Sequence, residues 1–188
     1  MKRRDALTAT VALFGIPIVG AEIFLSGCTK PEQKRIGLFT GEEIALLDEI
    51  GETILPVSEN SPGAKAAQIG NFMKVIVTDC YDEIEQKIFL DGLIKFKGFC
   101  ASKAGDDFLN LSSEKRKAIV IDLDKEARLY SIAGKPGDAQ HYFSLIKQLT
   151  VWGYFTSEPG ATKALRFVPI PGRYEGCIPY SGEAAWLY

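Results

Sequence analysis

Histidine is nearly absent from this chain of 188 residues, which contains His141 and no other. The spacings C-x-x-C, C-x-x-C-H and H-E-x-x-H are missing, which argues against a zinc site or a covalently attached haem. Glycine-rich phosphate loops of the forms G-x-G-x-x-G and G-x-x-x-x-G-K are missing as well, so no nucleotide or flavin fingerprint is present. The sequence therefore predicts no catalytic, cofactor-binding or metal-binding residues in this chain.

An excess of positive charge is also lacking, because 22 Lys and Arg residues face 24 Asp and Glu residues. No clustered basic face is evident, and a nucleic-acid partner is therefore not expected. Hydrophobic residues make up 46% of the chain, as in an ordinary globular protein. After the first 27 residues, roughly 160 remain, which is enough for one domain with one core.

The N-terminus has the order of a secretory signal. A basic start is followed by an apolar stretch from Ala6 to Leu25 and then by Leu25-Ser26-Gly27-Cys28. These four residues resemble a bacterial lipobox, in which the cysteine is lipidated and becomes the new first residue. We therefore expect residues 1–27 to be a signal peptide, 28–38 a tether that begins with lipidated Cys28, and 39–188 the folded domain.

Two alternatives concern this N-terminal segment. It approaches the roughly 20 residues that span a bilayer and would then be an uncleaved anchor, although Pro17 and Glu22 disfavour that. Arg3 and Arg4 resemble the pair of a twin-arginine signal, which exports folded proteins, but an ordinary secretory signal is basic too. Each alternative predicts a periplasmic protein held to a membrane. Thr29, rather than aspartate, follows Cys28, which favours the outer membrane.

The body shows helical periodicity, with turn signals between the helices and no two-residue alternation of strands. One helix is expected to start at Thr40, which forms a capping box with Glu43, and to stop at Pro56. Two further helices are expected from Ala64 to Cys80 and from Asp82 to Gly105. A fourth is expected to start at Ser112, with Ala118, Ile119, Ile121 and Leu123 facing the core. A fifth is expected to start at an Asp138 cap, with Phe143, Ile146 and Leu149 facing the core. The fold class is mainly α, a compact helical bundle.

The last 36 residues, from Gly153, change in character because proline, glycine and aromatic residues are concentrated there. Prolines remove backbone donors and fix φ, so the sequence predicts a rigid, extended C-terminal segment. Such a segment either wraps its own bundle or presents a stiff surface to another protein. Aromatic residues and arginines such as Arg166 and Arg173 dominate many interfaces, and both alternatives stay open.

Three cysteines remain after Cys28, namely Cys80, Cys100 and Cys177. Their odd number allows at most one internal disulfide, and burial as small hydrophobic residues is favoured for all three. His141 lies in the first turns of an expected helix, where a solvated or hydrogen-bonded surface histidine is commoner than a catalytic base.

Two pairs of segments carry a family resemblance. The first is Glu52–Pro56 with Ser61–Ala64, and the second is Gly153–Ala161 with Pro171–Cys177. In these residues the chain resembles the small subunit, subunit 3, of the gluconate 2-dehydrogenase family. The resemblance implies a non-catalytic subunit that carries the export signal and binds a separate large subunit of the glucose-methanol-choline type. FAD would lie in that large subunit, and haem c in a possible cytochrome c subunit.

The resemblance further implies that the small subunit aids maturation and translocation of the flavoprotein. A lipobox is not general in the family, so Cys28 suggests that this subunit also supplies membrane attachment and puts a membrane-bound cytochrome in doubt. The expected partner surface is the segment 154–180 with the loop 56–64 beside it. Its candidate residues are Tyr154, Phe155, Glu158, Pro159, Arg166, Pro171, Arg173, Tyr174 and Glu175.

Two other functions remain as alternatives from the sequence. A free-standing enzyme would use carboxylates such as Asp106, Asp107 or Glu158. A lipoprotein binding module would capture glycans, or another periplasmic protein, through its C-terminal aromatic residues.

Overall fold

A computed structural model describes residues 37–187 except 136, 171, 173–175 and 178. The expectations for Arg3, Arg4 and Cys28 lie outside these residues. Among the residues described, no helix is both long enough and apolar enough to cross a bilayer. The elements are α3 (Gly41–Ile54), η2 (Ala64–Ala67), α4 (Ile69–Asp79), α5 (Glu83–Ala104), η3 (Phe108–Asn110), α6 (Ser113–Ala133), α7 (Tyr142–Thr156), the π-helix η4 (Gly160–Ala164), β1 (Arg166–Phe167) and β2 (Trp186–Leu187).

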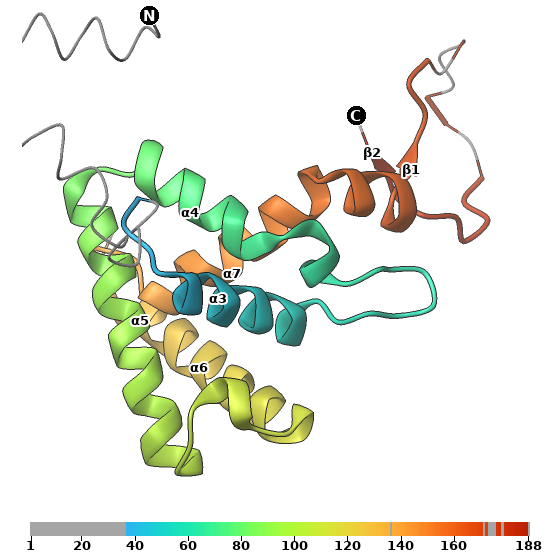
Figure 1. The fold of residues 1–188 in the computed structure, drawn as a ribbon. Coiled ribbons are helices and arrows are strands. Elements are labelled where there is room, and N and C mark those ends of the chain that lie inside the picture. The colour runs from blue at the N-terminus through green and yellow to red at the C-terminus, as the bar shows by residue number, and fades with distance from the viewer. Residues whose placement is uncertain (1–36, 136, 171, 173–175, 178, 188) are drawn as a thin grey trace, which may run out of the picture. The chain divides into compact units, whose positions relative to one another are not determined.

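The helices α3 to α7 pack around one core, as predicted for a mainly α bundle (Figure 1). Every one of these helices contributes fully buried side chains. Ring edges meet ring faces between Phe39 and Phe89, at 5.9 Å, and between Phe96 and Phe108, at 5.0 Å. The largest side chains in this core are Tyr154, Phe39, Phe89, Phe96, Phe143, Leu47, Ile50, Ile69, Met73, Leu93, Leu123 and Ile146.

The start of α3 confirms the predicted capping box. The Thr40 side chain accepts the N–H of Glu43 at 3.2 Å, and the Glu43 carboxylate accepts the N–H of Thr40 at 2.9 Å. These two bonds satisfy donors that have no partner within the helix. The helix ends at Ile54, two residues before Pro56.

The helix expected from Ala64 to Cys80 is interrupted at Gln68. A short 3₁₀ turn, η2, precedes Gln68, whose φ of 51° is left-handed, and α4 begins immediately after it. The bend brings the first turn of α4 against α3. A Cβ on Gly70 would lie 2.3 Å from the carbonyl oxygen of Ile44, so this close approach requires glycine. Periodicity alone could not show this bend.

The helix α5 confirms the sequence prediction at both ends, with a capping box of Asp82 and Glu85 and a left-handed Gly105. Gly92, within α5, is a contact point between two helices. A Cβ there would lie 2.3 Å from the Cβ of Tyr142, so the glycine allows α5 and α7 to pack closely.

Two details of α6 and α7 correct the sequence predictions. Ile119 and Leu123 face the core as expected, but Ala118 and Ile121 are exposed, because they lie on the other side of α6. The N-cap of α7 is His141 rather than Asp138. The Asp138 carboxylate instead accepts the N–H of Lys135 in the preceding turn, at 2.7 Å.

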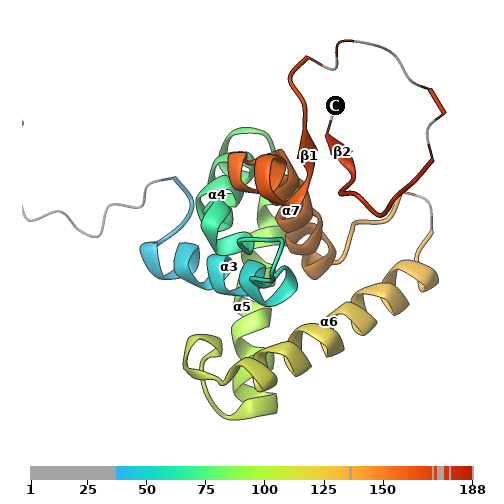
Figure 2. The same cartoon turned by 90° about the vertical axis from the view of Figure 1, so that its right-hand side faces the viewer.

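The C-terminal segment is only partly the extended tail that the sequence predicted. The chain stays helical through α7 to Thr156 and again in η4, and only residues 165–187, which we call the arm, leave the bundle. The arm closes on itself because β1 and β2 pair in parallel, with Arg166 opposite Trp186. Figure 2 shows β1 and β2 side by side. The Arg166 N–H donates to the carbonyl of Ala185 at 2.8 Å, and the Arg166 guanidinium lies 3.9 Å from the centre of the Trp186 indole.

The cysteines differ from one another. Cys100 is buried, as expected, and burial together with the nearby Asp107 raises the pKa of its thiol to about 11. Cys80 and Cys177 are exposed, which corrects the expectation that all three are buried. Cys80 follows the last turn of α4, and Cys177 lies on the arm. All three thiols are free.

Candidate functional site

Two of the four sequence segments that carry the family resemblance, Ser61–Ala64 and Gly153–Ala161, meet in space. Ser61, in the loop after α3, shares a hydrogen bond of 2.6 Å with the hydroxyl of Tyr154 in α7. Tyr154 is 1% exposed, so its hydroxyl reaches the loop from inside the bundle. This bond joins residues 93 positions apart and places the loop 55–64 beside the start of the C-terminal segment, as the sequence analysis expected.

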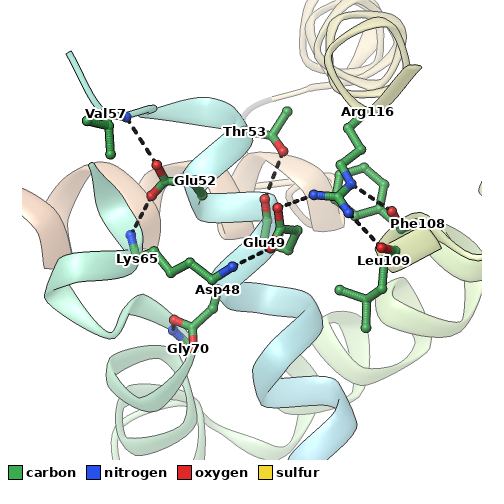
Figure 3. Close-up of polar contacts among 10 residues, drawn as sticks. All are labelled: Asp48, Glu49, Glu52, Thr53, Val57, Lys65, Gly70, Phe108, Leu109 and Arg116. Carbon is green, nitrogen blue, oxygen red and sulfur yellow. Dashed lines mark hydrogen bonds and ion pairs between the residues drawn. The ribbon is translucent and has the colours of Figure 1, made fainter. Parts of the chain in front are cut away.

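Glu52 holds the loop 55–64 at its base. Its carboxylate accepts the N–H of Val57 at 3.1 Å and the N–H of Lys65 at 2.8 Å, one from each side of the loop (Figure 3). Gly63 has a φ of 78°, and a Cβ there would lie 2.6 Å from a Glu52 oxygen. The loop therefore needs both a carboxylate at position 52 and glycine at position 63.

Two further backbone contacts close the loop. The N–H of Ala64 donates to the carbonyl of Leu55 at 2.9 Å, and Ser58 and Ser61 exchange backbone hydrogen bonds of 2.8 and 3.2 Å. Residues 56–60 nevertheless face solvent, and Val57 is 67% exposed. The result is a preorganised loop that presents an apolar side chain.

The other carboxylates on this face of α3 have structural partners too. Glu49 pairs with Arg116 of α6 and, at 2.6 Å, with Lys65 (Figure 3). Arg116 also donates to the carbonyls of Phe108 and Leu109, at 2.9 and 2.6 Å. Asp48 accepts the N–H of Gly70 at 2.8 Å, where α4 begins. These two carboxylates tie α3 to its neighbours.

The turn after α7 is fixed as closely as the loop. The Ser157 hydroxyl donates to the carbonyl of Tyr154 at 2.6 Å and accepts the N–H of Gly160 at 3.2 Å. A Cβ on Gly160 would lie 1.9 Å from the Tyr154 carbonyl oxygen, which excludes any other residue there. The segment 157–161 therefore packs against α7, and the arm starts from a rigid support.

The structure divides the residues predicted for the partner surface. Tyr154 is buried and anchors the loop from below, so it is not a surface contact. Phe155 and Pro159 are half-buried, and Glu158 and Arg166 are exposed. The predictions for Pro171, Arg173, Tyr174 and Glu175 lie outside the described residues.

Exposed apolar side chains add to this surface. Phe167 is 50% exposed, Ile170 is 85% exposed and Tyr180 is 80% exposed, all on the arm, with Val57 on the loop. All four lie within the expected segments 154–180 and 56–64, although none of them is among the named candidate residues. Ile170 and Val57 carry no periodic signal, because each is an isolated aliphatic residue in a turn-rich stretch. Figure 1 places the loop and the arm at the same side of the bundle.

The carboxylates considered for a free-standing enzyme do not form a site. Asp106 and Asp107 follow the end of α5, whereas Glu158 follows α7. Asp106 is exposed, and the Asn110 amide, at 3.0 Å, and the N–H of Asp107 lower the pKa of its carboxyl. None of the three lines the hollows found between α5, α6 and α7.

His141 has a capping role at the start of α7. Its Nδ1 accepts the N–H of Phe143 at 3.3 Å, and its Nε2 lies 3.8 Å from the Glu126 carboxylate. Burial lowers the pKa of the imidazole, partly opposed by Glu126. His141 borders an open hollow of about 820 Å³ between α5 and α6. Within the described part of the chain, no three His, Cys, Asp or Glu side chains gather as metal ligands would.

Comparison with known families gives one match. The family model described as Gluconate 2-dehydrogenase subunit 3 matches residues 41–172, from the start of α3 into the arm. The match contains the loop 55–64, the Ser61–Tyr154 contact and η4, and it stops before Cys177. No curated protein and no solved structure matches the chain.

Proposed function

Because the chain belongs to the gluconate 2-dehydrogenase subunit 3 family, we propose that it is the non-catalytic small subunit of an FAD-dependent sugar or sugar-acid dehydrogenase. In this proposal it binds the flavoprotein large subunit of the glucose-methanol-choline type. The contacts come from the loop 55–64 and from the exposed surface that runs from Phe155 along the arm to Tyr180. FAD belongs to the large subunit, and haem c belongs to a third subunit where one is present.

The contact between Ser61 and Tyr154 is the observation that carries this proposal. It brings together two of the four segments that carry the family resemblance, and it supports two exposed elements at one side of the bundle. Apolar side chains that stand in solvent, such as Val57, Ile170 and Tyr180, gain free energy when a partner covers them. Surfaces of this kind are typical of protein interfaces.

The two parts of the proposed partner surface are held to the bundle in different ways. The loop is fixed before binding, which lowers the entropy lost on association. The arm is held at its base by the contact between Arg166 and Trp186 and by the pairing of β1 with β2, and it exposes Ile170 and Tyr180.

The N-terminal segment completes the proposal. A flavoprotein that takes up FAD in the cytoplasm crosses the membrane already folded, and the twin-arginine pair Arg3-Arg4 would supply the signal for both subunits. Lipidated Cys28 would then hold the complex at the periplasmic face of a membrane, with the outer membrane preferred. The signal would therefore serve the bound partner as well as the small subunit.

The test is purification of the chain from its native membrane under mild detergent. We expect a flavoprotein of oxidoreductase size to co-purify, and we expect truncation after Phe167 to abolish this. A chain carrying Lys95→Glu, a charge reversal on α5, is the matched control and should retain the flavoprotein. A wild-type chain that purifies alone, or that oxidises sugars without added flavoprotein, would contradict the proposal.

A further inference from the structure

The helix α6 is apolar on two opposite sides. Ile119, Leu123 and Ala127 face the core, whereas Ile121, Leu129 and Ile132 are 44%, 67% and 80% exposed. No residue of α6 after Ala127 is buried, and Figure 2 shows this end of the helix running out from the bundle. A surface helix of a monomeric protein normally has one apolar side, so the second side needs an explanation.

Next to this outer side, a groove runs between α6 and α7. It consists of two hollows, of about 550 and 460 Å³, which share Asp124, Arg128 and Lys147. Apolar side chains line both of its walls: Ile54, Val120 and Ile121 in one hollow, and Val151 and Trp152 in the other. The Trp152 ring is half-exposed and meets the Phe72 ring edge-on at 5.4 Å, so its orientation is fixed in advance.

The groove is basic although the chain as a whole has a net charge of −2. Its lining holds Lys117, Lys125, Arg128 and Lys147, against the single carboxylate of Asp124. Asp122, another acid, lies 3.6 Å from Lys125. Asp124 accepts hydrogen bonds from Lys147 at 2.5 Å and from Arg128 at 3.0 Å.

From these observations we infer that the α6–α7 groove, with the exposed side of α6, is a docking site for an acidic amphipathic helix of another polypeptide. Apolar residues of that helix would contact Trp152, Val151 and Ile121, and its carboxylates would face the basic lining. Helices recognised in grooves commonly combine apolar anchors with flanking charges in this way. This site is separate from the loop and the arm, and it does not depend on the proposed function.

Charge argues against a second copy of this chain as the occupant. In a symmetric dimer the same patch contacts itself, which would bring the basic lining of one groove against that of the other. Like charges that face one another across an interface oppose association. An acidic partner removes this repulsion and gains both the apolar contact and the ion pairs.

The fluorescence of Trp152 gives a direct test. The chain has two tryptophans, so the full chain with Trp186→Phe reports on Trp152 alone. The probe is a peptide of about 18 residues, long enough for a helix, with leucines on one side and glutamates elsewhere. A matched peptide has lysine in place of every glutamate. We expect the acidic peptide to shift the Trp152 emission to the blue and the lysine peptide to leave it unchanged.

Charge-reversal variants identify the site. Lys117→Glu combined with Arg128→Glu should weaken the acidic peptide by about tenfold or more. Lys95→Glu combined with Lys103→Glu, which makes the same charge change on α5, should leave the affinity unchanged. Circular dichroism shows whether both variants fold. If the first variant does not fold, the two peptides on the unmodified groove still decide the question.

Three results would overturn the inference. The first is equal binding of the acidic and lysine peptides, and the second is the absence of any Trp152 response to the acidic peptide. The third is a dimer of the chain alone that Ile132→Glu dissolves, because the outer side of α6 would then pair with a second copy. No flavoprotein is present in these measurements, so their failure leaves the proposed function standing.

Discussion

The loop 55–64 and the arm 165–187 are both exposed, yet they are held in different ways. The loop is bound at its base by Glu52 and near its end by Ser61, whose hydroxyl meets Tyr154 of the core. The described part of the arm is closed only by its own two-residue strand pair and the contact between Arg166 and Trp186. Exposure alone therefore does not tell how rigid a binding surface is. Changes in the loop should cost stability, whereas equivalent changes in the arm should not.

The largest difference in stability between a loop variant and an arm variant is expected from two glycines, both with positive φ. Gly63→Ala should lower the free energy of unfolding by about 2–3 kcal/mol, because it adds backbone strain and a clash with Glu52. Gly172→Ala, at a φ of 76° with no atoms near the added Cβ, adds only backbone strain of about 1–2 kcal/mol within the arm, so it should lower the free energy of unfolding by less than Gly63→Ala does. Denaturant unfolding of the two variants measures both. Equal losses would mean that the arm is as strongly coupled to the core as the loop.

The second largest difference in stability is expected between variants of two carboxylates, Glu52 at the base of the loop and Glu183 in the arm. Glu52→Ala removes the acceptor of two backbone N–H groups and should destabilise the chain by about 1.5 kcal/mol. Glu183 in the arm also accepts two hydrogen bonds, both from Ser181, but only within the arm. Glu183→Ala should therefore leave the midpoint of thermal unfolding unchanged. A drop in midpoint for Glu183→Ala would argue against an independent arm.

A smaller difference in stability is expected between variants of two tyrosines, Tyr154 and Tyr180. Tyr154→Phe keeps the ring but removes its hydroxyl, and it should cost about 1 kcal/mol through the lost bond to Ser61. Ser61→Ala alone and the double variant complete a thermodynamic cycle that isolates this bond. Tyr180→Phe, at an 80% exposed position of the arm, is the control and should have no effect. A coupling energy near zero would remove the physical link between the loop and α7.

The arm itself is sensitive to Trp186. Replacing Trp186 with Ala removes a cation–π contact of about 1 kcal/mol with Arg166, which should open the arm but leave the global unfolding free energy unchanged. Hydrogen exchange at the Arg166 amide, which donates to Ala185, should become faster. Exchange in α3 should stay as it is. If α3 also exchanged faster, the arm would be part of the cooperative core.

The smallest effect is expected for the pH dependence of the difference between the loop and the arm. The only histidine of the chain, His141, lies in neither segment. Burial lowers the pKa of His141 in the folded chain, so the unfolded chain binds more protons as pH falls below 6.5. Stability should therefore decrease from pH 7 towards pH 5, and His141→Asn, which keeps a capping side chain, should remove this part of the decrease. The difference between Gly63→Ala and Gly172→Ala should not change with pH. A pH-dependent difference would place a titrating group in one of the two segments.

Much of the bundle could be predicted from the sequence because its signals are local. The capping box at Thr40, the helix start at Asp82 and the stops at Pro56 and Gly105 are confirmed as helix boundaries. The break at Gln68 could not be predicted, since it follows from the close crossing of α3 and α4 at Gly70. The outward positions of Ala118 and Ile121 were missed for a related reason, because α6 is apolar on both sides.

The candidate site was predictable in its segments but not in its contacts. The sequence located the loop and the C-terminal segment, and it placed them side by side. It could not show that Tyr154 points inward, since an aromatic residue near a proline-rich stretch suits a core as well as an interface. Nor could it show that Glu52 closes the loop, because its partners are backbone N–H groups and carry no sequence signal. Tertiary packing decides both features.

The central claim is that the loop and the arm together bind the flavoprotein, and hydrogen–deuterium exchange tests it most directly. Exchange of the chain is measured alone and in the presence of the purified large subunit. We expect new protection in residues 55–64 and in the arm after Phe167, with little change in α5. Protection confined to α5, or none in the loop and the arm while the two subunits remain bound, would contradict it.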